Sequence, residues 1–322
     1  MNSRGGIMNR SLGKALHALG GLLPSISTGR RLRQVDRRLL HVEDLARRID
    51  HFTLGTSALY IGGNRVLLRI LAGRHLFMLY VHADDKLITP SLVVNGRYEP
   101  ELTDFFTAAL QPDSHCLDVG ANLGYFTCFM AKHCPQGRVI GVEPNPPIHA
   151  LAVDNVLLNA LGDNATMLNM AASDQAGELT LYHRIGRAGN TSMAACGEDF
   201  TRAFQEPPEE AFQVATIPID QLRDQLGGRI DFLKIDVEGA EPLAFAGARE
   251  TIRENPHLQV VMEWAPAQIQ HAGFDIAGFV REIETAGLKP YLLGADLPRP
   301  ISHADLIGLA YQPGVLLRRD PA

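Results

Sequence analysis

Short apolar runs alternate with amphipathic stretches along most of the chain after residue 100. Runs such as "HCLDV", "RVIGV" and "IDFLKI" have the length of buried strands, and between them apolar residues recur every three or four positions, as on one face of a helix. Strands that alternate with helices build a parallel sheet covered by helices on both faces. We therefore expect residues 101–322 to fold as one α/β domain.

The same pattern sets the boundaries of the expected elements. The expected helices are 104–110, 125–133, 148–159, 219–226, 240–254 and 269–286, and the expected strands are 115–119, 138–142, 165–171, 214–217, 230–235 and 258–263, followed by short strands at "PYLLG" and "GVLLRR". Residues 177–213 interrupt the alternation. We expect them to form an inserted flap in which "FQEPPEEAF", residues 204–212, is an exposed loop.

The first hundred residues follow a different pattern. Residues 1–50 form a basic extension, and within it the stretch 30–50 places apolar residues on one face of an amphipathic helix. Packing on the body of the chain is favoured for this helix over docking to a partner or a membrane surface. Residues 51–100 contain apolar runs broken by glycine turns, so we expect a small β-rich lead-in, because so short a segment buries little core alone.

Charge and cysteine content narrow the class of protein. Residues 1–50 carry ten Lys/Arg and four Asp/Glu, a net +6, so the rest of this chain of net charge −6 carries −12. Such an acidic body disfavours a nucleic-acid partner. The four cysteines include no C-x-x-C pair, which argues against a zinc site and fits a reducing, cytoplasmic location. No apolar run reaches the ~20 residues that cross a bilayer.

The start of the chain and the oligomeric state stay open. An apolar patch, "ALHALGGLL", precedes no cleavage-site pattern, so a basic N-terminal start is favoured over a signal peptide or an organellar transit segment. The sequence does not specify how many copies of the chain associate.

The stretch "CLDVGANLGYF", residues 116–126, carries the first chemical signal. Asp118 ends an expected strand, and Gly120, Ala121, Asn122 and Gly124 form the turn into a helix. Ligands of open parallel sheets lie beyond the carboxyl ends of the strands, and glycine lets the backbone turn tightly and approach them. The spacing differs from the G-x-G-x-x-G of dinucleotide folds. An acid here repels a diphosphate but suits an α-ammonium group, so we expect S-adenosylmethionine as the cofactor.

Residues near the other strands complete the expected cofactor site. Glu143, with Pro144 beside it, ends the second strand, where a carboxylate can accept both hydroxyls of a ribose. In the loop after the third strand, Ser173 or Asp174 is expected to bond the adenine amino group. Glu99, just before the first helix of the domain, is expected near the methionine end of the cofactor.

With these residues assembled, the chain resembles the FkbM-type class I S-adenosylmethionine-dependent methyltransferases. The resemblance covers roughly residues 80–265 and rests on "GRYEPELTDFF", "LDVGANLGYFT", "VIGVEPNP", "DNVLLN", "AASD" and "DFLKIDVEGAE". It implies a Rossmann-like, mostly parallel seven-stranded sheet with helices on both faces. It also implies O-methylation of a hydroxyl on a sugar, glycolipid or polyketide-like metabolite.

The fourth and fifth strands supply the candidates for catalysis. Asp236 is the leading one, either through its side chain as a base or through its backbone toward the methionine ammonium. Glu263 ends the fifth strand at the same edge and can bind substrate or act as a base, and His183 in the flap is a further candidate base. Glu238 is equally a helix-dipole acid and a site residue. Lys234 is expected to be structural, paired with a neighbouring acid.

These observations predict an S-adenosylmethionine-dependent methyltransferase that acts on a small molecule or glycan. We assign no metal ion, because no dense carboxylate spacing requires one. Two alternatives remain: a non-catalytic protein that binds the cofactor or assists assembly, and an N-methyltransferase acting on protein or amine nitrogen. The acceptor itself is not encoded in any readable motif.

Overall fold

The computed structural model describes residues 58–184, 191–193, 209–294 and 297–320. Residues 56–322 form one compact unit. The expected helix at residues 30–50 and most of the expected loop at 204–212 lie outside the described residues. None of the described helices is long and apolar enough to cross a membrane.

The centre of this unit is a mostly parallel sheet with the strand order β14-β13-β15-β12-β11-β4-β5-β6. Five neighbouring strands run parallel, namely β12 (Gln259–Trp264), β11 (Phe232–Ile235), β4 (Cys116–Val119), β5 (Val139–Val142) and β6 (Ala165–Leu168). β15 (Gln312–Arg318) runs antiparallel between β12 and β13 (Lys289–Leu292), and the two-residue β14 (Arg299–Pro300) adds an edge. Without this edge piece the sheet has the seven strands that were expected.

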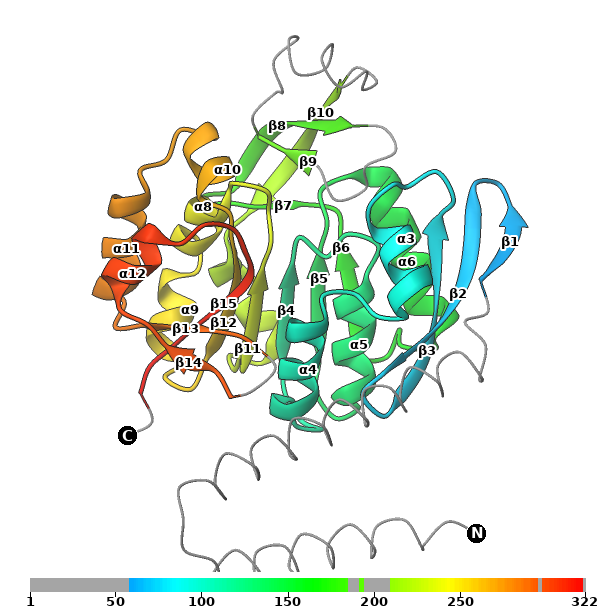
Figure 1. Cartoon of the computed structure of the whole chain (residues 1–322), viewed down its shortest axis with the longest axis horizontal. Coiled ribbons are helices and arrows are strands. Elements are labelled where there is room, and N and C mark those ends of the chain that lie inside the picture. The colour runs from blue at the N-terminus through cyan, green and yellow to red at the C-terminus, as the bar shows by residue number, and fades with distance from the viewer. Residues whose placement is uncertain (1–57, 185–190, 194–208, 295–296, 321–322) are drawn as a thin grey trace, which may run out of the picture. The chain divides into compact units, whose positions relative to one another are not determined.

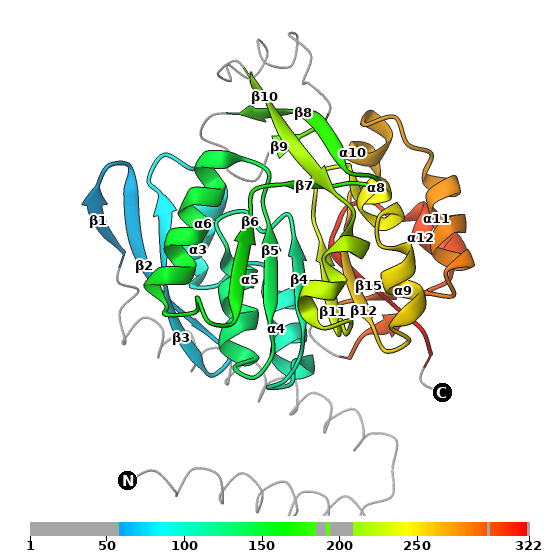
Figure 2. The same cartoon turned by 180° about the vertical axis from the view of Figure 1, so that it is seen from behind.

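Helices cover both faces of the sheet, as the alternating pattern predicted (Figures 1 and 2). One apolar core includes side chains of α3 (Ile88–Asn95), α4 (Pro100–Ala109), α5 (Tyr125–His133) and α6 (Pro146–Leu158). The core on the other face includes η1 (Ile219–Gln221), η2 (Arg223–Leu226), α8 (Glu241–Ala246), α9 (Arg249–Glu254), α10 (Pro266–His271), α11 (Ile276–Thr285) and α12 (His303–Gly308). Successive strand residues therefore point into different cores.

The first strands form a separate antiparallel sheet that shares a core with the domain. Its members are β1 (Leu59–Gly62), β2 (Arg65–Ala72) and β3 (His75–His82). Phe77 and Leu79 on β3 are buried in the same apolar cluster as Phe129 of α5. The segment 51–100 that was expected to be β-rich also contains α3, which the apolar pattern did not predict.

The outer edge of β3 bonds to a helix instead of a strand. Asn155 of α6 accepts from the Tyr80 amide at 2.6 Å and donates to the Tyr80 carbonyl at 3.0 Å. Asn159, just after α6, bonds the Met78 amide and carbonyl in the same way, at 2.8 and 2.6 Å. Asn155 also donates to the carbonyl of Leu123 at 2.8 Å. The β1–β3 sheet is thereby joined to the turn that follows β4.

The inserted flap is a small sheet above the carboxyl ends of the parallel strands (Figure 1). Its strand order is β7-β10-β8-β9, with β7 (Ala171–Ala172), β8 (Gly177–Arg184), β9 (Thr191–Ser192) and β10 (Glu209–Ile217). Residues 209–212 belong to β10, where they pair with β8, so the expectation of a loop there was wrong. Pairing with β8 includes Glu209 and Glu210, the last two residues of the polar "PPEE" segment.

Three expected helices are broken. Residues 219–226 form two 3₁₀ turns, and residues 240–254 divide into α8 and α9 at Gly247. A Cβ at Gly247 would lie 2.0 Å from the Ser173 carbonyl oxygen, so the chain passes too close to another segment there for any larger residue. Residues 269–286 divide at Gly273, where α10 ends. The φ of Gly273 is +93°, a value that only glycine adopts readily.

Candidate active site

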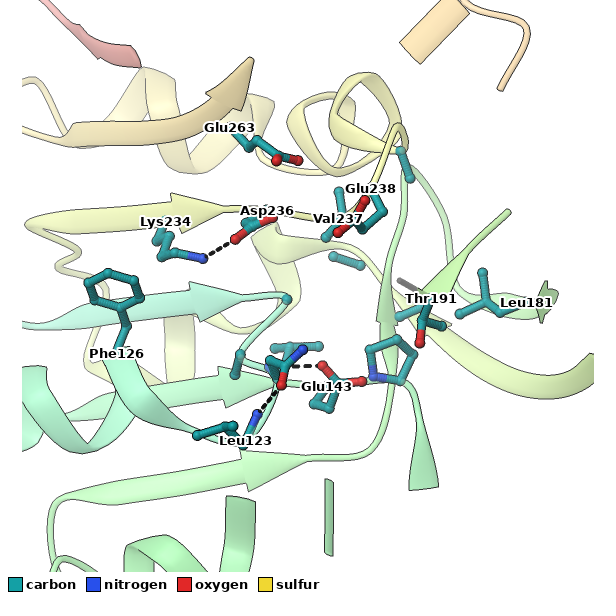
Figure 3. Close-up of a pocket in the computed structure, with 18 of the residues that line it drawn as sticks. Leu123, Phe126, Glu143, Leu181, Thr191, Lys234, Asp236, Val237, Glu238 and Glu263 are labelled. Carbon is teal, nitrogen blue, oxygen red and sulfur yellow. Dashed lines mark hydrogen bonds and ion pairs between the residues drawn. The ribbon is translucent and has the colours of Figure 1, made fainter. Parts of the chain in front are cut away.

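A cavity of about 300 Å³ lies beneath the flap, at the carboxyl ends of β4, β5, β11 and β12. Figure 3 shows the labelled residues around it: Glu143 and Thr191 on one side, and Asp236, Glu238 and Glu263 on the other. Ligands of open α/β sheets bind at this edge. A volume of this size is at the lower end of the range for small-molecule sites.

The turn after β4 adopts the strained backbone that its glycines allow. Gly120, Asn122 and Gly124 all have positive φ, at +79°, +50° and +82°. A Cβ at Gly120 would lie 1.7 Å from the carbonyl oxygen of Asp236, so its glycine permits contact between two loops. A Cβ at Gly124 would press on Ala152 of α6 at 3.3 Å. Close packing of neighbouring segments thus requires glycine at both positions, and Gly120 also lines the cavity.

Glu143 is held in place by backbone amides at the end of β5. Its Oε2 accepts from the Asn122 amide and its Oε1 from the Asn145 amide, both at 2.9 Å. The side chain is buried, and burial raises the pKa of Glu143 to about 7 although these amides oppose the shift. Each carboxylate oxygen has a second lone pair. Glu143 is thus a preoriented acceptor for two hydroxyl groups.

Lys234 and Asp118 form a buried pair below the cavity. The parallel register places Lys234 directly across from Asp118, and their charged atoms are 4.0 Å apart. Asp118 also accepts from the Thr127 hydroxyl at 2.6 Å and is completely buried, which raises its pKa. Lys234 is bonded to Asp236 at 2.8 Å and lies 5.2 Å from the centre of the Phe126 ring. Although burial alone lowers the pKa of Lys234, Asp236 and Asp118 raise it above its ordinary value.

Acidic side chains gather on the side of the cavity formed by β11 and β12. Burial, followed by the charge of Asp236, raises the pKa of Glu99 and of Glu238 to about 8 and that of Glu263 to about 11. Glu238, at a φ of +54°, accepts from the Gln268 amide group at 2.5 Å. Within the described residues, Oε2 of Glu99 and Oε2 of Glu263 are buried without a hydrogen-bond partner.

The structure brings most of the predicted residues to the cavity. The predicted residues that line it are Glu99, Gly120, Ala121, Asn122, Glu143, Pro144, Asp236 and Glu263. Asp118 and Gly124 do not line it: Asp118 faces α5, and Gly124 begins that helix.

The remaining predicted residues lie behind the cavity wall. Ser173 bonds Asp174 at 3.1 Å, and the lining at this point is instead Met170 to Ala172. His183 bonds the hydroxyl of Thr191 at 3.2 Å, and burial lowers its pKa. Thr191 lines the cavity, so His183 is one residue removed from it.

Several lining residues were not predicted from the sequence. Tyr98, Gln268 and Tyr311 line the cavity together with the apolar flap residues Leu179 and Leu181. Tyr311 precedes β15, the antiparallel strand that begins at the edge where the parallel strands end, so its position carried a usable signal. The position of Gln268 carried no such signal, because it depends on where α10 begins after β12.

The fold is that of a class I methyltransferase, and the match to a family model and to curated relatives agrees. The methyltransferase FkbM domain matches residues 118–286. The chain is 28% identical to "Methyltransferase sdnD" of Sordaria araneosa, over 56% of this chain and 81% of that protein. It is 32% identical to "Methyltransferase 1" of Beauveria bassiana over 42% of this chain, and spans 58% of that relative. The solved O-methyltransferase from Bacillus cereus in complex with SAH matches with 14% identity over 69% of this chain and 81% of that one, at a TM-score of 0.40.

The chain belongs to the FkbM methyltransferase family, and S-adenosylmethionine is its cofactor. The residues present fit this molecule. Glu143 offers oriented oxygens to a diol, the flap and Met170 offer apolar surface to a base, and the unpartnered Oε2 of Glu99 lies among groups that suit an ammonium. Among the described residues, no set of ligating side chains is arranged for a metal ion.

Proposed function

We propose that this protein transfers the methyl group of S-adenosylmethionine to a hydroxyl of a small molecule or glycan. The observation that carries the proposal is Glu143, whose two oxygens are fixed by the Asn122 and Asn145 amides at the cavity wall. A carboxylate held in this way can accept from both hydroxyls of a ribose without reorganising. In the reaction, an O–CH₃ bond forms, the S–CH₃ bond breaks, S-adenosylhomocysteine is left, and the acceptor hydroxyl loses a proton.

The acceptor proton needs a base at the cavity, and we assign this role to Asp236. Its side chain lines the cavity, and Lys234 holds its Oδ2 at 2.8 Å, which leaves the other oxygen for the hydroxyl. The Lys234 ammonium is itself buried over Phe126, so the carboxylate is fixed in position. A positioned base of this kind contributes about 10²–10⁴-fold to a rate.

The acidic lining also supports a small-molecule or glycan acceptor. A polymer of phosphates needs cations, and Lys234, the one cation among the described lining residues, is already paired with Asp236 and Asp118. Of the flap residues described, Leu181 and Thr191 line the cavity, and Figure 3 shows Thr191 beside Glu143. The flap therefore restricts what can enter beside the cofactor.

Calorimetry with S-adenosylhomocysteine tests the cofactor assignment. The wild-type protein is expected to bind, and Glu143→Ala is expected to weaken binding by about 100-fold or more, because it removes two hydrogen bonds to a charged group. Glu178→Ala, which removes an exposed carboxylate of β8, is the matched control and is expected to bind like the wild type. Equal affinity of Glu143→Ala and the wild type would refute the assignment.

Turnover then tests the reaction. Labelled S-adenosylmethionine offered with a panel of hydroxyl acceptors is expected to yield an O-methyl product. Cofactor binding without any transfer would favour a non-catalytic role, and a methyl group recovered on nitrogen would favour an N-methyltransferase.

A further inference from the structure

Carboxyl groups at the cavity outnumber the cations that the chain and the cofactor supply. Among the described residues that line the cavity, five carry a carboxyl group, namely Glu99, Glu143, Asp236, Glu238 and Glu263, and one, Lys234, is a cation. S-adenosylmethionine brings an ammonium, a sulfonium and a carboxylate, and so adds one net positive charge. Since Lys234 is already paired with Asp236 and Asp118, a surplus of carboxyl groups remains.

The surplus is located on the β12 side of the cavity. Glu263 is only 8% exposed, and its Oε2 is buried with no hydrogen-bond partner in the described part of the chain. The amide group of Gln268 donates a hydrogen bond to Glu238, and Oε1 of Gln268 is likewise buried without a partner among the described residues. All three residues line the cavity, and Figure 3 shows Glu263 and Glu238 on the side away from Glu143. The unpartnered atoms here are Oε2 of Glu263 and Oε1 of Gln268, and both are acceptors when Glu263 is ionised.

A ligand that satisfies these acceptors must bring donors, and the charges decide which kind. Neutral hydroxyl groups could fill the hydrogen bonds, but they would not favour ionisation of these carboxyl groups. Burial, followed by the charges of Asp236 and Glu238, raises the pKa of Glu263 to about 11, so this carboxyl ionises only with a positive charge beside it. A cation with N–H groups supplies both the hydrogen-bond donors and the positive charge, as in charge-assisted hydrogen bonds elsewhere in proteins. The cofactor ammonium fits the unpartnered Oε2 of Glu99 instead.

We infer that the methyl acceptor carries an alkylammonium group, which Glu263, Glu238 and Gln268 bind while a neighbouring hydroxyl receives the methyl group. The inference rests on the proposed function and deepens it, since it names the acceptor as a hydroxylated amine. An ammonium held between carboxylates keeps its proton and has no lone pair. The amine is therefore a recognition group, and the hydroxyl is the nucleophile.

The test uses two probes that differ only in this group. Ethanolamine and ethylene glycol have the same length and each carries a hydroxyl, but the first is a cation at neutral pH, as a lysine side chain is. Each is titrated by ligand-observed NMR into protein saturated with S-adenosylhomocysteine, so that the cofactor's own ammonium site is filled. Ethanolamine is expected to bind about tenfold more tightly or better, as for a hydrogen bond to a charged partner.

Variants locate the effect. Glu263→Gln keeps the shape of the side chain and is expected to remove most of the preference for ethanolamine, and Glu238→Gln is expected to reduce it. Glu178→Gln, the same change on the exposed surface of β8, is expected to leave it intact. Equal binding of the two probes to the wild type would overturn the inference, and so would an unchanged preference in Glu263→Gln.

Calorimetry with S-adenosylhomocysteine comes first, and it separates failure of the proposed function from failure of the cationic acceptor. If the wild type fails to bind it, the proposed function fails. If the wild type binds it but does not distinguish the probes, only the cationic acceptor is refuted. Retained binding in Glu263→Gln shows that this variant is folded.

Discussion

The two sides of the cavity treat buried carboxylates in opposite ways. At the β5 side, the chain itself donates two amides to Glu143, so that the group is satisfied before any ligand arrives. At the β11 and β12 side, Glu99 and Glu263 each keep a buried oxygen without a partner among the described residues, and their pKa values are raised further, to about 8 and about 11. The first side is preorganised, whereas the second is completed by what binds there.

The two sides therefore contribute to ligand affinity in different ways. Preorganised groups gain affinity because little ordering or rearrangement remains to be done. Unsatisfied buried acceptors are costly in the free protein, by roughly 1–3 kcal/mol each. A ligand that donates hydrogen bonds to these acceptors removes that cost. The β12 side should therefore bind a ligand with matching donors more tightly than a ligand without them.

The largest effect on this comparison is expected from Lys234→Met. The substitution keeps much of the apolar stem but leaves Asp118 and Asp236 without their shared cation in a buried position. Removing one partner of a buried ion pair costs about 3–5 kcal/mol. Urea denaturation should show a loss of this size in the free energy of unfolding.

Arg249→Met provides the control for Lys234→Met. Arg249 pairs with Glu282 at 3.1 Å on the surface, where such pairs contribute about 0–1 kcal/mol. If both variants lost the same small amount of stability, the buried pair would not support the acidic side of the cavity.

An intermediate effect is expected from the same Glu→Gln change made on each side. Burial raises the pKa of Glu238 to about 8, so between pH 4.5 and 8 the folded protein binds more protons than the unfolded chain, and stability falls as pH rises. Glu238→Gln removes this ionisation and should stabilise the unliganded protein at pH 9 by at least about 2 kcal/mol. The gain should vanish at pH 5, where the carboxyl is neutral.

Glu143→Gln should instead destabilise the protein at pH 5, where the wild-type carboxyl is neutral because burial raises its pKa to about 7. An amide group there would turn an N–H toward the Asn122 or Asn145 amide, which already donates to the carboxyl group. The variant should lose about 1–3 kcal/mol at this pH, the cost of an unsatisfied buried polar group. Denaturation of both variants at pH 5 and pH 9 checks the pair, and equal stabilities of the two variants at pH 5 would remove the distinction between the two sides.

The smallest effect is expected from His183→Ala. His183 touches the cavity only through Thr191, so its loss should change the methyl-transfer rate by no more than about threefold, far below the 10²–10⁴-fold of a positioned base. Asp236→Asn, measured in the same assay, should show the full loss. A hundredfold decrease for His183→Ala would place the base in the flap.

Much of the fold could be predicted because its signals are local. The helix Tyr125–His133 was predicted with its observed ends, and the parallel strands were predicted from apolar runs that both cores require. The broken helices could not be predicted. Gly247 is needed because its Cα passes the Ser173 carbonyl, a contact across more than seventy positions that no local pattern contains.

The candidate site was predictable where a residue directly follows a strand and not where its depth in the strand decides. Glu143 and Asp236 follow strands of the same sheet, and both line the cavity. Asp118 pairs with Gly141 and Lys234, two positions before Glu143 and Asp236, so it lies inside the sheet and bonds Thr127 of α5. Ala171 and Ala172 pair with β10 of the flap, and they line the cavity beside the position where Ser173 was predicted.

The asparagines that bond β3 also follow from a match of two repeats. Four residues of helix rise about 6 Å, and two residues of strand about 6.6–6.8 Å, so a pair at i and i+4 on a helix can face alternate residues of a strand. The exposed edge of the three-stranded sheet is thereby sealed against pairing with another polypeptide, a hazard for any open edge. Inserting one residue between Asn155 and Asn159 would rotate one amide away by about 100° and reopen that edge.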